Sequence, residues 1–600
     1  MGVIIITTLE TVNTNHERVF VVLNKRLISV LLCFAMVFAC LTMAGAEVTF
    51  KPGSYTGSTT GVHDTVAVEV TVSENKIEKI VVEEDETIGC GTVAAELMPQ
   101  RIIEAQSLKV DTVSGATITS NAVLRAAEAA LKQATDNLDA LKKPIEKKEP
   151  VAGEAEAFDV VIVGGGIAGL NAAYELEYNY PDVSYVVLEQ LDVLTGSLHG
   201  SGGAIISDKS KKHAELGQES SIEEIIKILD GGTGYPVNHS YAQKVYSIGE
   251  DILNRILDNG LPIKTSYLSA KAYSDKVYAI FADGNGEGFV QFYYDWIEKQ
   301  PINLRMHSKV TALLTQDGKV TGVTVEDGEK IYDIKAKSVL LATGGFGNNM
   351  AMVKELEPDY VGYLPRVGYG ADGSGFELTK QFNPQIIGNG MMGPGLAATI
   401  DCKPLGGKFM VNKDGKRVGN ESKGADMAQI IAKSGETVYV IVDGKYQDSP
   451  SIFSMVEPLD EHLRKGYAKK FDSLEELADG MKINKENLLA TVEAYNTAAA
   501  NGTELEFGLA AASATVVDTA PYYVERVIPF YLGSIPSLKV DESMLLLNGE
   551  DQIVEGLYCA GELTEANLWD NVYPGVGVGI SYATYSGPYA IRCMMEDWAK

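Results

Sequence analysis

Three glycines and one acidic residue in this 600-residue chain have types and spacing that suit the binding of a nucleotide. Gly164-x-Gly166-x-x-Gly169 follows the apolar run Val160–Val163, and Glu189 ends the next apolar run. The first glycine allows a tight turn, the second lets backbone approach a pyrophosphate, and the third lets helix and strand pack closely. The helix N-terminus would bind the phosphates, and Glu189 would accept hydrogen bonds from a ribose. The pattern predicts a dinucleotide site on a strand–turn–helix unit.

The alternative is a glycine-rich turn in an ordinary α/β unit. Two later segments argue against it, Ser338–Gly345 (SVLLATGG) and Gly556–Glu562 (GLYCAGE), because each places glycines at the end of an apolar strand. Ligands at the carboxyl ends of parallel strands are held by such bare backbone. We therefore expect the three segments to converge on one cofactor.

Over nearly all of residues 158–595, these segments resemble the fumarate reductase and 3-ketosteroid dehydrogenase superfamily of FAD flavoproteins. The resemblance implies an α/β fold, with a Rossmann-like FAD-binding domain and an inserted α+β substrate-capping domain. It implies FAD, bound non-covalently, rather than NAD. The residues that it implies for FAD binding are Gly164, Gly166, Gly169, Glu189, Ser201, Gly202, Gly203, Thr343, Gly344, Gly345, Asp372, Gly561 and Glu562.

A second motif, Asp111-Thr-Val-Ser-Gly-Ala-Thr117, precedes a segment with helical apolar spacing. Its chemistry alone is that of a Ser/Thr-rich capping segment. The surrounding residues 47–134, however, resemble a small α+β FMN-binding domain in which FMN is joined by a phosphoester to the last Thr of Asp-x-x-Ser-Gly-Ala-Thr. The resemblance implies covalent FMN at Thr117, and with it a flavin transferase as a partner.

The N-terminal segment predicts export. Lys25 and Arg26 precede the uncharged run Leu27–Ala46, which ends in small residues and is typical of a secretory signal. The run could instead remain as a membrane anchor, and Cys40 could carry a lipid. We expect a protein at the extracellular face of the membrane, the cell surface or the periplasm, with its anchor open. Covalent FMN suits export, because a cofactor lost outside the cytoplasm is not replaced.

Composition restricts the class of protein. A hydrophobic content of 45% supports several domains, and a net charge of −30 argues against nucleic acid as a partner. The cysteines after residue 46 are Cys90, Cys402, Cys559 and Cys593, which lack the spacing of haem, iron–sulfur or zinc sites. No metal is expected. The chain is thus similar to flavocytochrome c without haem, and a membrane electron donor is the expected source of electrons.

The predicted domain order follows from these segments. The boundaries are residues 1–46 for the export segment, 47–134 for the FMN-binding domain, 135–157 for a linker, 158–365 and 516–600 for the FAD-binding domain, and 366–515 for the capping domain. The linker is charged and interrupted by prolines. A capping domain of this kind excludes water from the flavin.

The substrate residues depart from the fumarate reductase pattern. No His follows His462 and no Arg lies between Arg526 and Arg592, so the side chains that clamp two carboxylates are missing. The segment Tyr573-Pro-Gly-Val-Gly577 resembles instead that of 3-ketosteroid dehydrogenases, in which the Tyr hydroxyl and the second Gly N–H bind a ketone oxygen. Two donors on one carbonyl oxygen would stabilise an enolate. The alternative for Tyr573 is a packed aromatic beside a turn.

Two residues are candidate proton donors, Tyr531 and Lys423. If the substrate is a carboxylate, Lys423, Arg366 or Arg417 would anchor it instead. Fumarate itself is not the expected substrate.

The sequence therefore predicts an exported two-flavin reductase that passes electrons from FMN to FAD to a carbonyl-conjugated C=C bond. The small-molecule substrate would be an enone, such as a 3-ketosteroid, or an enoate of the urocanate or cinnamate type. One alternative is a 3-ketosteroid-type dehydrogenase working in the oxidative direction, which an FMN-binding domain makes less fitting. Another is a flavin electron carrier without catalysis, because a fold alone does not establish function.

Overall fold

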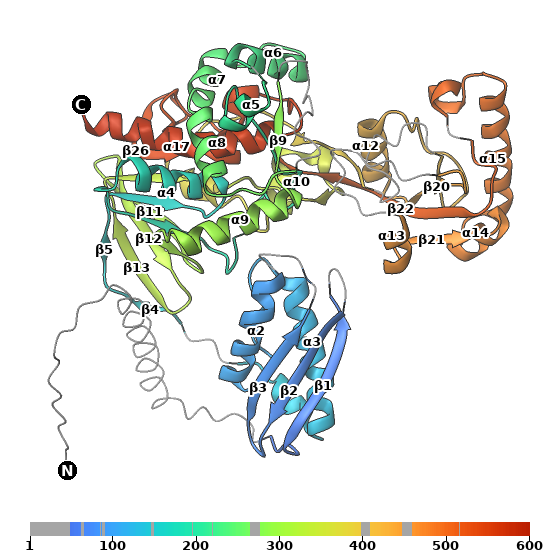
Figure 1. The fold of residues 1–600 in the computed structure, drawn as a ribbon, viewed down its shortest axis with the longest axis horizontal. Coiled ribbons are helices and arrows are strands. Elements are labelled where there is room, and N and C mark those ends of the chain that lie inside the picture. Colours follow the sequence, from blue (N-terminus) through green and yellow to red (C-terminus); the bar gives the residue numbers. More distant parts are fainter. Residues whose placement is uncertain are drawn as a thin grey trace.

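A computed structural model describes residues 48–61, 65–84, 86, 91–145, 149–194, 196–218, 220–264, 277–397, 409–446, 459–514 and 516–600. They form a small N-terminal domain, a large α/β domain and a distal domain (Figure 1). The predicted export segment lies outside the described residues, as do Cys40, Cys90 and Cys402. Among the residues described, no helix combines the length and apolar character that crossing a membrane requires.

The N-terminal domain is an antiparallel sheet covered by two helices. The strands are β1 (Gly53–Thr60), β2 (Thr65–Val72) and β3 (Ile77–Glu83), and the helices are α2 (Gly91–Ala105) and α3 (Thr117–Ala134). Strand β2 alternates buried valines with more exposed residues, as expected of a strand with one face on a core. The domain has its own hydrophobic core, which confirms the predicted small α+β fold.

The predicted linker is ordered at both ends. The 3-10 helix Leu138–Lys142 packs Leu141 into the N-terminal core. Strands β4 (Val151–Ala152) and β5 (Glu156–Ala157) pair in parallel with β13 (Lys330–Lys335) of the large domain. Residues 143–150 therefore connect the 3-10 helix of the N-terminal domain to strand β4 of the large domain.

The large domain is built on a six-stranded sheet. In spatial order its strands are β10 (Leu304–Arg305), β7 (Tyr185–Leu188), β6 (Val160–Val163), β14 (Ser338–Leu341), β26 (Ile553–Cys559) and β25 (Leu545–Leu547). All neighbours are parallel except β25 and β26. The strands β6, β7 and β14 are wholly buried, which explains their continuous apolar sequence.

Helices α4 (Ile167–Asn179) and α17 (Val578–Trp598) pack together in this domain, and the sheet of β11 (Lys309–Gln316), β12 (Lys319–Glu326) and β13 contacts β14 and β26 through β12. Further helices are α5 (Lys211–Glu215), α6 (Ile222–Thr233), α7 (His239–Tyr246), α8 (Gly249–Asp258), α9 (Asn285–Lys299), α10 (Met350–Leu356), α11 (Ser374–Thr379) and α16 (Ala566–Trp569). The short strands β8 (Ala204–Ile206) and β9 (Ala279–Phe281) pair with each other.

One buried carboxylate joins three helices of the large domain. Glu175 of α4 lies 3.0 Å from Arg255 of α8 and 2.7 Å from Arg592 of α17, and its side chain is fully buried. A buried charge is tolerated because it is paired on both oxygens. The cluster fixes α4, the helix that follows the glycine-rich turn.

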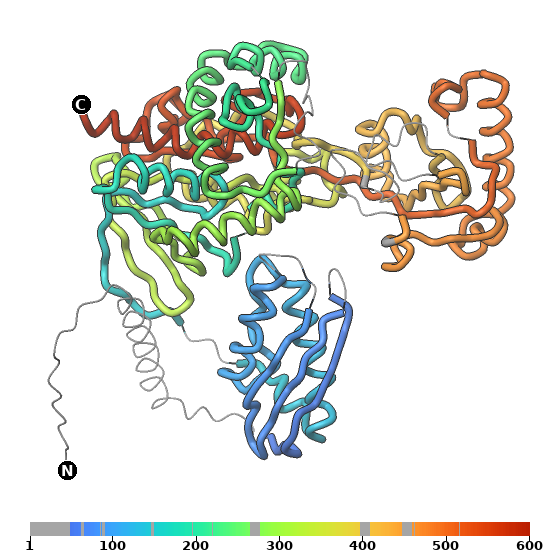
Figure 2. Tube along the Cα trace, viewed as in Figure 1, coloured from blue at the N-terminus to red at the C-terminus, as the bar shows by residue number. Residues whose placement is uncertain are grey.

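The distal domain is arranged around the long strand β22 (Tyr522–Tyr531), which leads back into the large domain (Figure 2). Its other elements are β15 (Leu364–Pro365), β18 (Gly395–Ala397), β19 (Met410–Asn412), β20 (Val438–Val442), β21 (Ala468–Phe471), α12 (Gly424–Ser434), α13 (Leu459–Lys465), α14 (Leu474–Met481) and α15 (Lys485–Ala500). Its two cores draw their buried residues from 409–527, whereas Phe376 and Met391 pack in the main core.

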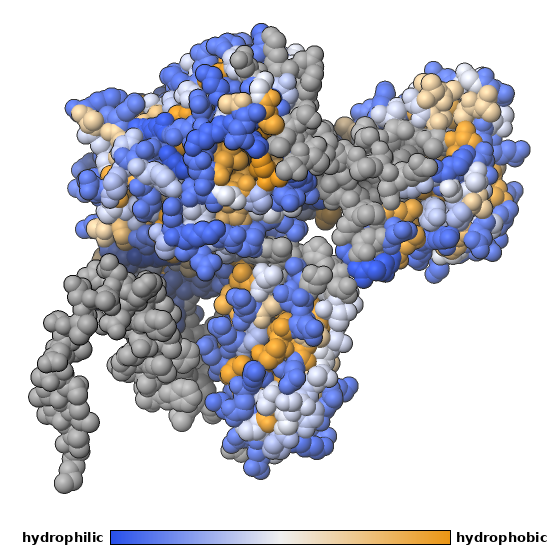
Figure 3. Space-filling view, viewed as in Figure 1, coloured by the Kyte–Doolittle hydropathy of each residue, from blue (hydrophilic) through white to orange (hydrophobic). Residues whose placement is uncertain are grey.

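Hydrophilic side chains cover most of the face shown in Figure 3, in keeping with the acidic composition.

Candidate active site

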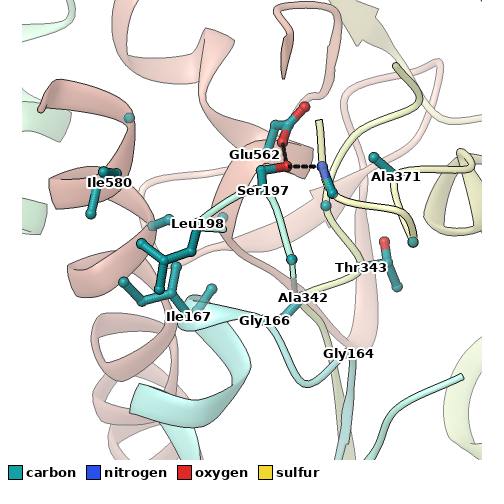
Figure 4. Close-up of a pocket in the computed structure, with 18 of the residues that line it drawn as sticks. Gly164, Gly166, Ile167, Ser197, Leu198, Ala342, Thr343, Ala371, Glu562 and Ile580 are labelled. Atoms are coloured by element: carbon teal, nitrogen blue, oxygen red, sulfur yellow. Dashed lines mark hydrogen bonds between the residues drawn. The ribbon is translucent and has the colours of Figure 1, made fainter. Parts of the chain in front are cut away.

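The three glycine-rich segments converge on one pocket at the carboxyl ends of β6, β7 and β14 (Figure 4). The space inside it is about 1700 Å³, part of which is open to solvent. The predicted residues that line it are Gly164, Gly166, Glu189, Ser201, Gly202, Thr343, Gly344, Gly561, Glu562, Tyr573 and Gly577.

The turn after β6 has the shape that a pyrophosphate needs. Gly164 has φ +110°, a conformation that favours glycine, and a Cβ there would lie 2.3 Å from the carbonyl oxygen of Ala342. A Cβ on Gly169 would lie 2.0 Å from the oxygen of Gly164, so this glycine serves close helix packing. Nothing lies within 4 Å of a Cβ position on Gly166, which leaves open space before α4.

Thr343 gives a second sign that the pocket receives a polar ligand. Its Oγ1 is buried in the pocket wall without a hydrogen-bond partner among the described residues. A buried hydroxyl is normally paired, so a ligand that supplies a partner fits this position. The glycine cradle and the unpaired hydroxyl together suit FAD.

Four of the predicted FAD residues are not among those that line the pocket, namely Gly169, Gly203, Gly345 and Asp372. A Cβ on Gly345 would lie 2.1 Å from Ser534 Oγ, and Asp372 accepts a hydrogen bond from the N–H of Ser374 at 2.9 Å.

Glu189 is held in place by backbone. Its two oxygens accept hydrogen bonds from the N–H groups of Gly165, at 2.7 Å, and Leu191, at 2.8 Å. Burial raises the pKa of this carboxyl above its usual range. It lines the pocket beside the glycine turn, where an acceptor for a ribose was predicted.

Glu562 is similarly fixed on the other side of the pocket. It accepts hydrogen bonds from the N–H of Ser534 at 2.9 Å and from Ser197 Oγ at 2.9 Å, the latter drawn in Figure 4. Burial raises its pKa as well.

Tyr573 and Gly577 lie at the end of the pocket where α17 begins. The Tyr573 hydroxyl accepts a hydrogen bond from the N–H of Gly579 at 3.4 Å, and its ring meets Trp569 edge-on at 5.9 Å. Burial raises the pKa of Tyr573, so the hydroxyl keeps its proton and can donate it in a hydrogen bond. Gly577 precedes the first turn of α17 with φ +83°.

Glu565 is a further residue of the pocket, and it was not predicted from the sequence. This residue is 1% exposed and lines the same pocket, and its Oε1 has no hydrogen-bond partner in the described part of the chain. Burial, and then the neighbouring Glu562, raise its pKa well above the usual range. The signal in the sequence is its position three residues after Glu562, because residues i and i+3 share one side of a 3-10 helix, and Glu565 directly follows the 3-10 turn Gly561–Thr564.

The two predicted proton donors are not among the pocket residues. Tyr531 is fully buried and donates its hydroxyl hydrogen to the oxygen of Gly347 at 2.6 Å. Lys423 is exposed at the start of α12 in the distal domain. Their role as proton donors stays a prediction.

Of the two arginines predicted as carboxylate anchors, one lines the pocket and the other does not. Arg366 lines the pocket, with its guanidinium 5.2 Å from the ring centre of Phe530. Arg417 is buried against Glu421, so its charge is already paired.

The predicted attachment residue Thr117 is exposed at the first position of α3. The preceding loop is fixed by Ser120, whose Oγ accepts a hydrogen bond from Val113 N–H at 3.0 Å and donates one to the oxygen of Ala116 at 2.8 Å. An exposed threonine directly after a fixed loop fits covalent modification.

Fold and pocket define a flavoprotein. The model of the FAD binding domain family matches residues 159–580, and that of the FMN-binding domain family matches residues 61–132. The chain therefore belongs to the FAD binding domain family and carries an FMN-binding domain before it. These matches confirm the predicted family resemblance and the predicted fold class.

Known relatives span several substrates. The chain is 26% identical over 603 residues to NADH:acrylate oxidoreductase of Vibrio harveyi (87% of this chain, 59% of the relative) and 24% identical over 580 residues to NADH:fumarate oxidoreductase of Klebsiella pneumoniae (93% and 60%). It thus spans about three-fifths of the length of these two relatives. Urocanate reductase of Eggerthella lenta is 25% identical over 535 residues, with 85% of this chain and 87% of the relative covered.

Two solved structures have a similar fold. A flavocytochrome c3 fumarate reductase in an open conformation has a TM-score of 0.65 at 21% identity, covering 77% of this chain and 84% of that chain. A 3-ketosteroid Δ1-dehydrogenase of Sterolibacterium denitrificans has a TM-score of 0.56 at 18% identity, covering 74% and 100%.

Proposed function

We propose that the protein is an exported two-flavin reductase that passes electrons from FMN to FAD to a C=C bond conjugated to a carbonyl group. The observation that carries the proposal is the pair Tyr573 and Glu565, a hydroxyl and a carboxyl group that line the same FAD-type pocket and whose pKa values are both raised by burial. FAD bound there would supply hydride equivalents, and FMN would supply the electrons that restore them.

The side chains have distinct roles in this proposal. The Tyr573 hydroxyl hydrogen-bonds the substrate carbonyl and stabilises the negative charge that develops on its oxygen, a task shared with the Gly577 N–H. Glu565, whose pKa is raised by burial, donates a proton to the α-carbon from its protonated form and recovers it from solvent. Tyr531 and Lys423 remain the alternative donors, and Lys423 would need the distal domain to close on the pocket.

The pocket suits a ketone better than a dicarboxylate. Arg366 is the one basic side chain among the described residues that line it, so a single carboxylate at most would find a partner. The other ionisable side chains of the pocket near Tyr573 are the carboxyl groups of Glu562 and Glu565, which favour an uncharged carbonyl over a carboxylate. Relatives named for acrylate, fumarate and urocanate keep the enoate alternative open.

The proposal also covers how the two flavins are bound and what supplies the electrons. FMN is attached covalently to Thr117 by a flavin transferase, FAD is bound without a covalent link, and a membrane protein supplies electrons at the cell surface or in the periplasm. The exposure of Thr117 supports the covalent attachment of FMN.

The test is anaerobic reoxidation of the purified holoprotein. The protein is reduced with dithionite-reduced methyl viologen and is then mixed with fumarate, urocanate, cinnamates and Δ1- or Δ4-3-ketosteroids. We expect reoxidation by an enone or a monocarboxylic enoate and none by fumarate. Reduced flavin that no activated alkene reoxidises would contradict a reductase and favour an electron carrier. Faster turnover of the saturated ketone by oxidised enzyme would favour the dehydrogenase direction.

A further inference from the structure

Asp192 connects the two flavin-binding domains. It lies in the loop after β7, three residues beyond Glu189 of the FAD pocket, and its side chain is 8% exposed. Its Oδ2 accepts a hydrogen bond at 2.7 Å from the N–H of Ser114, a residue of the FMN-attachment motif. Its Oδ1 lies 3.0 Å from Arg101 of α2, also in the N-terminal domain.

Arg101 ties this contact to the motif. Its Nη1 donates hydrogen bonds to the carbonyl oxygens of Asp111, at 3.1 Å, and Thr112, at 2.9 Å, while its Nη2 reaches Asp192. One guanidinium therefore holds both the loop that leads to Thr117 and a carboxylate of the other domain. Charge-assisted bonds of this kind are stronger than neutral ones.

Two neighbours complete the contact from the large domain. His307 Nδ1 lies 3.1 Å from Asp192 Oδ1, and the N–H of His307 donates to the oxygen of Leu191 at 3.0 Å. Val193, which follows Asp192 in the sequence, is fully buried within the hydrophobic core of the N-terminal domain. The large domain thus inserts an apolar side chain beside a charged one.

We infer that Asp192 and Val193 form a docking element that seats the FMN-attachment loop beside the FAD pocket, and that Asp192 is a positioning residue for electron transfer between the two flavins. Domains joined by a linker move relative to one another unless their contact holds them. Leu191, the residue before Asp192, donates its N–H to Glu189 Oε1, and both Leu191 and Glu189 line the FAD pocket, so the docking element directly follows pocket residues. The docking follows from the contacts alone, whereas the role in electron transfer rests on the proposed function.

The experiment compares full-length holoprotein with Asp192→Ala, Asp192→Asn and the control Asp258→Ala, which removes an exposed ion pair to Lys211. Hydrogen exchange is measured for the peptide that covers residues 111–117. We expect exchange about tenfold faster in Asp192→Ala, since a buried bond to a charged group is lost. Asp192→Asn, which keeps an oxygen for Ser114 N–H, should fall between it and the wild type, and Asp258→Ala should match the wild type.

The second readout is the rate at which reduced FMN passes electrons to FAD, followed by stopped flow. We expect it to fall about tenfold in Asp192→Ala, in proportion to the lost docked population, while turnover driven by methyl viologen acting directly on FAD stays at the wild-type rate. Unchanged exchange at 111–117 would overturn the docking element. Faster exchange with an unchanged FMN-to-FAD rate would overturn the positioning role. Absence of alkene turnover in the wild type would refute the proposed function and leave the exchange result standing.

Discussion

Glu562 in the 3-10 turn Gly561–Thr564 and Glu565 directly after that turn line one pocket, but the two carboxyl groups are held differently. Ser534 and Ser197 donate hydrogen bonds to Glu562, whereas Glu565 Oε1 has no partner among the described residues. One acid is therefore fixed to the protein. The other is left for a ligand.

Glu565→Gln should separate proton transfer from substrate binding. The amide keeps the size of the side chain and can donate a hydrogen bond, but it carries no transferable proton. We expect kcat to fall about 10²-fold or more with little change in KM. Steady-state kinetics with a methyl viologen donor measure both, and Glu555→Gln on the exposed face of β26 is the matched control. A kcat equal to that of the control would return the role to Tyr531 or Lys423.

Tyr573→Phe should weaken catalysis on ketones more than on carboxylates. Loss of one donor to a developing oxyanion lowers kcat by about 10² to 10³. The control is Tyr589→Phe. Tyr589 lies farther along α17, and its hydroxyl donates a hydrogen bond to the backbone oxygen of Glu542. Equal losses for an enone and an enoate would contradict the ketone-specific role, and an Arg366→Ala variant would then show whether carboxylate binding depends on that arginine.

Thr117→Ala should abolish covalent FMN and leave FAD in place. The intact mass of protein produced with its flavin transferase should lose the mass of one FMN, whereas released FAD stays near one per chain. Thr112→Ala, at a variable position of the same motif, should keep the modification. Covalent flavin that persists in Thr117→Ala would place the linkage elsewhere.

Glu175→Gln should destabilise the large domain. It leaves Arg255 and Arg592 without their shared buried carboxylate, and such a loss costs about 3 to 5 kcal/mol of unfolding free energy. Urea unfolding of the apoprotein measures the change. Asp251→Asn, which removes only the exposed acid beside the same arginines, should cost less than about 1 kcal/mol.

Asp192 predicts a pH dependence. Burial alone would raise its pKa, but hydrogen bonds from His307 and Ser114 and the charge of Arg101 lower it to about 2. Because the unfolded value is about 3.9, the charged form stabilises the fold above about pH 4, and this contribution is lost as the pH falls from about 4 toward 2. The stability difference between wild type and Asp192→Asn should therefore shrink across that window in urea titrations. A difference that does not change with pH would contradict the assigned interactions.

Local sequence predicted the parts of the site that depend on local geometry. The turn at Gly164, the first turn of α4 and the acidic end of β7 are specified within about 30 residues, so they could be recognised without a structure. The motif before Thr117 was equally local, because a fixed loop before a helix needs only its own residues.

Long-range packing decided the rest. The sequence around Glu565 does not indicate that this residue is buried, or that the nearby hydrogen-bond donors, Ser534 and Ser197, bind Glu562 instead. Asp192 and Ser114 are 78 positions apart in the sequence, and the periodicity of apolar residues does not predict a contact between them. The charged composition of residues 135–157 indicated a linker, but it gave no sign that β4 and β5 would pair with β13, because edge strands of two residues have no pattern of their own.

The short span between Lys143 and Pro150 has a consequence for reach. Eight residues extend at most about 28 Å. The FMN-binding domain therefore stays within that reach of the FAD-binding domain even when the contact between the two domains is broken. Tethering of this kind corresponds to a local concentration in the millimolar range. A small contact is then enough to keep the domains together for most of the time, and a longer tether should weaken their encounter without altering a single residue at either flavin.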